Sequence, residues 1–188
     1  MCEPFGPMIL DDLKKAVELS REKQAKLALR VARAAISSDD LEVRGLLHVV
    51  LTDRSCGVSV EEPGLTQSEF DVFQRQYLGD CIVRDCAGNW ALGAFPAAWE
   101  LAALFNGMVE SGQEARVSEH VQWIEQLAWK CSGKAREALV LGALEHIVSS
   151  KKARKKFAYW RQDPHLGSLY RDALSWSQNG GSSPLDSQ

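Results

Sequence analysis

Positively charged and aromatic side chains that could bind a partner are concentrated in one short segment, residues 151–161. Its six cations, with no acidic residue among them, are Lys151, Lys152, Arg154, Lys155, Lys156 and Arg161. Such a cluster can pair with the carboxylates of an acidic protein or with the phosphates of nucleic acid. The whole chain has a net charge of −3, so its other residues sum to −9. Because this acidic remainder repels phosphates, we expect a protein partner. A nucleic-acid-associated regulator that uses this segment is the alternative.

The same segment also has an apolar side. At helical spacing, Ala153, Phe157 and Trp160 fall on one face and the cations occupy most of the rest. One interpretation is an amphipathic surface helix with its aromatic rings in the core and its lysines in water. The other is a binding surface, and both stay open at this point. In the second case the contact residues are Lys151, Lys152, Lys155 and Lys156.

Six tryptophans lie between residues 90 and 176, and tryptophan is both a core residue and a frequent interaction hot spot. Trp99, Trp123 and Trp160 lie on apolar stripes, so we expect them in the core. Trp129 lies off the apolar stripe of its helix, and Trp90 lies in a loop bounded by glycines. Trp129 and Trp90 are therefore the tryptophans predicted to contact a partner.

No recognised pattern for catalysis, metal binding or cofactor binding occurs in the chain. The motifs HExxH, GxSxG, GxGxxG and the P-loop are all missing, and no two histidines have ligand spacing. We therefore expect no enzyme activity, no metal and no cofactor.

Glu145 is the one acidic residue that interrupts a strongly apolar helix. A partly buried carboxylate needs a partner, and Arg136, Lys152 or a backbone N–H group could supply one. A structural ion pair or hydrogen bond is the simpler interpretation, whereas a catalytic acid would need a second positioned group. The sequence leaves open whether Glu145 is structural or functional.

The cysteines are odd in number and scattered, which is unsuited to a disulfide framework. We expect free, buried thiols at Cys2, Cys56, Cys81, Cys86 and Cys131.

Helical periodicity dominates the chain and predicts an all-α fold. The clearest signals are a capping box at Thr66–Glu69, a cap at Asp163-Pro164, and a central buried helix at Ala138–Val148. The expected helices span about 11–36, 40–54, 66–87, 96–111, 114–132, 135–149, 151–161 and 164–176. Short loops between them favour an antiparallel array of seven to eight helices, with HEAT-like stacked pairs as a variant.

The domain prediction is a lead-in at 1–8, a single helical domain at 9–177 and a disordered tail at 178–188. The chain shows neither a signal-peptide pattern nor a membrane-spanning stretch, which predicts a cytoplasmic protein.

Several short motifs resemble those of uncharacterised bacterial all-helical proteins. They are Asn89-Trp90, Ala98-Trp99-Glu100-Leu101 with Phe105, Leu144-Glu145-His146, and the run Lys155–Trp160 with Asp163-Pro164. The resemblance covers about residues 81–176. Proteins of this kind are similar to the small immunity proteins that accompany secreted bacterial toxins. The resemblance implies that the chain is a protein-binding module that occludes a cognate toxin. It gives no catalytic residue to carry over to this chain. A structural protein is the remaining alternative, and self-association stays open.

Overall fold

The computed structural model describes residues 35–53, 58–62 and 64–178, and all regular structure in these ranges is helical. This confirms the all-α class. Seven helices are present in the described ranges when the uninterrupted α7–η2–α8 stretch and the α9–η3 stretch are each counted once. The antiparallel order and the HEAT-like pairing stay predictions. The predicted helix 11–36, apart from its last residues, and the tail after 178 lie outside the described residues. None of the described helices combines the length and apolarity needed to cross a bilayer.

Contacts divide the chain into two compact units. The first comprises residues 1–81 and 86–92, and the second comprises residues 82–85 and 93–188. Two packing units are compatible with one folding domain, so the single domain at 9–177 stays a prediction.

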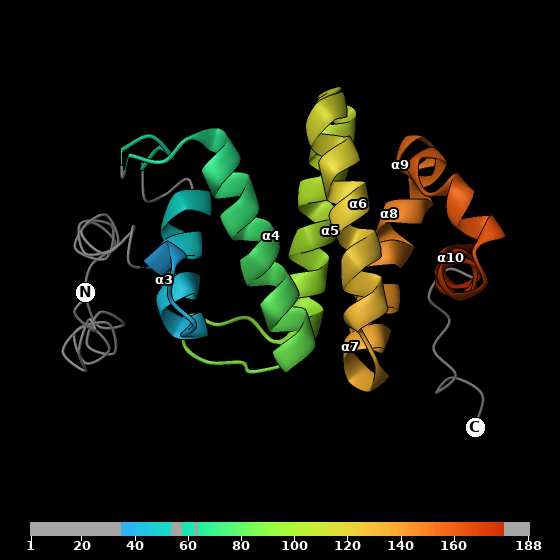
Figure 1. Cartoon of the computed structure of the whole chain (residues 1–188), viewed down its shortest axis with the longest axis horizontal. Helices are drawn as coiled ribbons and strands as arrows, with labels where there is room; N and C mark the ends of the chain where they lie inside the picture. Colours follow the sequence, from blue (N-terminus) through green and yellow to red (C-terminus); the bar gives the residue numbers. More distant parts are fainter. Residues whose placement is uncertain (1–34, 54–57, 63, 179–188) are drawn as a thin grey trace. The chain divides into compact units, whose positions relative to one another are not determined.

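The first unit contains helix α3 (Leu41–Thr52) and most of helix α4 (Gln67–Arg84) (Figure 1). Asp40 caps α3 by accepting a hydrogen bond from the Glu42 N–H at 2.8 Å. The predicted capping box is confirmed. Thr66 Oγ1 accepts from the Glu69 N–H at 3.2 Å, and Glu69 Oε2 accepts from the Thr66 N–H at 2.8 Å. Local side chains therefore fix where both helices begin.

A polar network fastens the segment 88–92 to these two helices. The Glu42 carboxylate accepts from the N–H groups of Trp90 and Ala91, each at 3.1 Å. The Tyr77 hydroxyl donates to the Trp90 carbonyl at 3.0 Å and accepts from the Leu92 N–H at 3.2 Å. Gly45 permits this approach, because a Cβ there would lie 2.2 Å from the Trp90 carbonyl oxygen.

The second unit begins with two helices joined by a tight turn, α5 (Ala94–Glu110) and α6 (Glu114–Lys130). The chain then continues without interruption through α7 (Gly133–Glu137), the π-helix η2 (Ala138–Leu144) and α8 (Glu145–Ser149). The central helix predicted at Ala138–Val148 is confirmed as mostly buried, although Leu141 and Glu145 are partly exposed and His146 is exposed. Its π-helical part packs along α5 and was not predicted.

The basic segment differs from the single helix expected for it. Helix α9 (Lys151–Lys156) ends after six residues, and a 3-10 helix, η3 (Ala158–Gln162), follows the break at Phe157. Helix α10 (Pro164–Gln178) then begins where predicted. Asp163 Oδ1 accepts from the N–H groups of His165 and Leu166, both at 2.8 Å.

Candidate functional site

The buried face of the basic segment is confirmed. Ala153, Phe157 and Trp160 are fully buried. The Phe157 ring lies 5.3 Å from Phe105 and meets Trp160 edge-on at 5.0 Å. These contacts anchor α9 and η3 in the core and turn the cations outward.

The four predicted contact lysines have unequal environments. Lys156 Nζ donates to the Glu114 carboxylate in an ion pair, so Lys156 already has an acidic partner. The other three, which we call the lysine row, are exposed and form no ion pair with any described residue: Lys151, Lys152 and Lys155. The lysine row is therefore the part of the predicted basic surface that can accept a partner's carboxylates.

One exposed aromatic ring lies in this segment, and another lies on helix α6, which the segment contacts. Trp129 on α6 is 57 % exposed and stacks on the His165 imidazole, with ring centroids 4.3 Å apart and planes 19° apart. Tyr159 on η3 is 51 % exposed, and its hydroxyl donates to the Glu125 carboxylate at 2.6 Å. Because Glu125 and Trp129 are four residues apart on α6, the two contacts lie on one face of that helix. We call Glu125, Trp129, Tyr159 and His165 the aromatic surface.

Tyr159 keeps its proton at ordinary pH. Partial burial, followed by the neighbouring Glu125 carboxylate, raises the pKa of the Tyr159 hydroxyl. The hydroxyl therefore acts as a donor to Glu125, and the ring has one preferred orientation.

Helix α6 contacts both the segment that carries the lysine row and the residues of the aromatic surface that lie on η3 and α10. Glu114 in its first turn pairs with α9, Glu125 in its middle holds η3, and Trp129 in its last turn stacks on α10. Figure 1 shows α9 and α10 following one another on the same side of α6. The lysine row thus lies near the start of α6, and the aromatic surface covers its second half.

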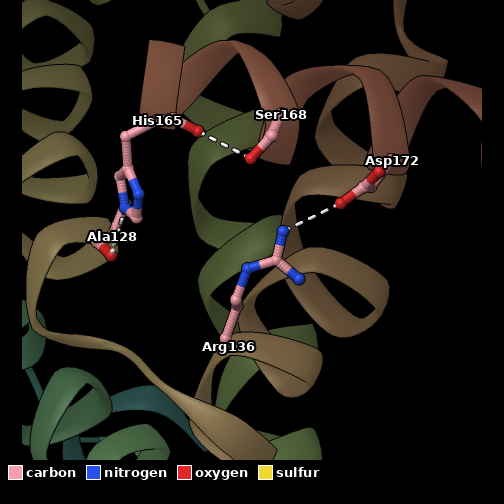
Figure 2. A network of polar contacts seen from close by, with 5 residues as sticks. All are labelled: Ala128, Arg136, His165, Ser168 and Asp172. Carbon is pink, nitrogen blue, oxygen red and sulfur yellow. Dashed lines mark hydrogen bonds and ion pairs between the residues drawn. The ribbon is translucent and has the colours of Figure 1, made fainter.

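A polar network borders the aromatic surface between α6, α7 and α10 (Figure 2). The His165 Nε2 atom donates to the Ala128 carbonyl at 3.4 Å, and the Ser168 hydroxyl donates to the His165 carbonyl at 2.8 Å. Arg136 pairs with Asp172 at 2.9 Å. No hydrogen bond joins the His165 ring to the Ser168 hydroxyl, so these two residues do not form a nucleophile–base pair.

The partners predicted for Glu145 are wrong. Arg136 pairs with Asp172 instead, and Lys152 forms no ion pair with any described residue. Glu145 is partly exposed, and within the described ranges its carboxylate has neither a hydrogen bond nor an ion pair. Water can therefore solvate this carboxylate, which removes the need for a buried partner.

One tryptophan assigned to the core is exposed. Trp99 is 53 % exposed and forms the wall of an open pocket of about 520 Å³ with Ala102, Ala103, Asn106 and His146. Its predicted burial is wrong, because the apolar stripe of α5 that packs inward runs through Leu101 and Phe105 instead. Trp160 is buried as predicted, while Trp123 and Trp90 are partly exposed.

The cysteine prediction is confirmed at two positions and wrong at one. Cys81 and Cys131 are buried free thiols, and burial raises the pKa of each to about 11. Cys86 is exposed because it lies just beyond the end of α4. Cys2 and Cys56 lie outside the described residues. No cluster of three or more potential metal ligands occurs within the described part of the chain.

Sequence reasoning missed Tyr159, Glu125 and His165. Tyr159 and Glu125 are 34 residues apart, and Trp129 and His165 are 36 apart, so no local pattern joins them. The one signal in the sequence was that an aromatic residue, Tyr159, lies among the cations of a basic segment. No family model, curated protein or solved structure matches this chain.

Proposed function

We propose that this chain is a cytosolic protein-binding module that contacts its partner through the aromatic surface. The observation that carries the proposal is the pair of exposed rings at Trp129 and Tyr159, each held in place by a neighbour on another element. Tryptophan and tyrosine are enriched at interaction hot spots, and a ring already held in its bound orientation loses little conformational freedom on binding. The narrower role, occlusion of a toxin by an immunity-type protein, rests on the resemblance described above.

The test compares two tryptophans with similar exposure. The partner is first captured from the native cell by cross-linking and is then titrated against purified variants. Trp129→Ala is expected to weaken binding by about thirtyfold, the loss of a hot spot worth about 2 kcal/mol. Trp99→Ala is the matched control, because Trp99 is similarly exposed and lies outside the aromatic surface.

Equal losses for the two variants, or no loss for either, would contradict the proposal. Failure to capture any protein by cross-linking would contradict it too. Circular dichroism of each variant establishes that a loss of binding does not arise from unfolding.

A further inference from the structure

We infer that the partner segment has two parts, an acidic stretch that lies over the lysine row and an apolar or aromatic anchor that packs on the aromatic surface. This inference rests on the proposed function, because it names the chemistry of the partner at the same surface. Two observations carry it: the unpaired charges of Lys151, Lys152 and Lys155, and the exposed rings of Trp129 and Tyr159.

The unequal use of the lysines indicates an acidic partner. Lys156 already pairs with Glu114, whereas its three neighbours form no ion pair with any described residue. These three point outward because Ala153 and Phe157 hold the opposite face of the segment in the core. Carboxylates from a partner would find a cluster of cations with no acidic residue here, whereas the rest of the chain has a net charge of −9.

Two contacts on α6, Glu114 with the lysine-bearing segment and Trp129 with His165, mark the far ends of the surface. Glu114, which contacts the segment that carries the lysines, and Trp129 are fifteen residues apart on α6. At about 1.5 Å per residue this distance is about 22 Å, which an extended peptide covers in about seven residues. A partner segment whose anchor packs on Trp129 therefore needs up to about seven residues between its acidic stretch and the anchor, and fewer if the anchor packs on Tyr159, which follows Lys155 by four residues.

The distribution of charge favours a peptide over nucleic acid. A single strand could stack bases on Tyr159 and Trp129, but it carries a phosphate at every nucleotide. Some of these phosphates would then lie against the Glu125 carboxylate, which belongs to the aromatic surface, and near Asp172 at its border. A peptide can carry its acidic residues at one end only, which matches the surface.

The test uses the full-length chain as bait for displayed random peptides of about sixteen residues, long enough to span both parts. Enriched peptides are expected to carry two or more acidic residues within about seven residues of an aromatic or large aliphatic residue. The tightest peptide is then labelled and titrated by fluorescence anisotropy. Reversing the lysine row (Lys151→Glu, Lys152→Glu and Lys155→Glu together) is expected to lower its affinity at least tenfold. Trp129→Ala should do the same.

Lys134→Glu is the control for non-specific charge effects, because Lys134 is exposed and lies on α7, outside the lysine row. The affinity of the Lys134→Glu variant for the peptide should stay within about twofold of that of the unmodified chain. If peptides depend on Trp129 but show no acidic bias and ignore the lysine reversal, this inference is overturned and the proposed function stands. If no peptide depends on Trp129, both are overturned. Tighter binding of a labelled oligothymidylate than of the best peptide would also overturn the inference.

Discussion

The exposed tryptophans differ in how well their rings are held. Trp129 lies nearly parallel to His165 at 4.3 Å, and the His165 ring is itself fixed by its bond to the Ala128 carbonyl. Trp99 is tilted against Phe95 at a larger centroid distance of 6.4 Å. Since rigid rings lose less freedom on binding, the closer stack makes Trp129 the better anchor of the two.

At the same scale, the two buried thiols predict a pH dependence of stability. Burial raises the pKa of Cys81 and Cys131 from 9.0 to about 11. Between these pH values the unfolded chain loses thiol protons that the folded chain keeps, so the free energy of unfolding should fall as pH rises. The expected loss is about 1–3 kcal/mol for each thiol by pH 11, measured by urea unfolding at several pH values.

Removing the thiols separates this effect from other titrating groups. The double variant Cys81→Ala, Cys131→Ala should have a flatter pH profile above pH 9, whatever its stability at neutral pH. Cys86→Ala is the control, because the Cys86 side chain is exposed. A double variant with the slope of the unmodified chain would show that the thiols do not contribute.

At the scale of elements, local signals were predictable and long-range ones were not. The caps at Thr66 and Asp163 follow from side chains within three residues of their backbone partners, so the sequence suffices. The π-helix η2 was missed because its run is almost wholly apolar, and a run buried on several sides gives no periodicity to distinguish helix types. The contact between Glu42 and Trp90 joins residues 48 apart, which no local pattern encodes.

The packing of η2 on α5 predicts opposite effects for two glycine substitutions. A Cβ at Gly142 would lie 2.7 Å from the Ala98 Cβ, whereas a Cβ at Gly107 on α5 has no atom within 4 Å. Gly142→Ala should therefore lower the free energy of unfolding by about 1–3 kcal/mol, because the helices must separate. Gly107→Ala should raise it by about 0.5–1 kcal/mol, because alanine favours the helix.

Urea unfolding of the two variants checks this pair directly. Adding Ala98→Gly to Gly142→Ala should restore part of the loss, since it removes the atom that the new Cβ meets. If Gly142→Ala were as stable as the original chain, the close packing of η2 on α5 would be contradicted.

At the scale of the whole molecule, each unit has an apolar core of its own, and the first also has a polar network. In the first, apolar side chains such as Leu46 and Phe73 are buried, and part-buried polar contacts of Glu42 and Tyr77 fasten the segment 88–92. The second is held mainly by apolar side chains such as Phe105, Phe157 and Trp160. The tryptophans are divided between the units, because Trp90 belongs to the first and the other five belong to the second.

This division allows each unit to be observed separately. Glu42→Gln removes the negative charge from the acceptor of the Trp90 and Ala91 N–H groups. It should lower the free energy of opening the segment 88–92 by about 1.5–3 kcal/mol. We expect the Trp90 indole resonance to shift and the two amides to exchange faster with solvent in NMR spectra. The other five indole resonances should stay in place, because those rings belong to the second unit. Glu61→Gln, at an exposed glutamate of the first unit, should change none of them. Movement of all six indole resonances would show that the Glu42 contacts hold more of the molecule than their own unit.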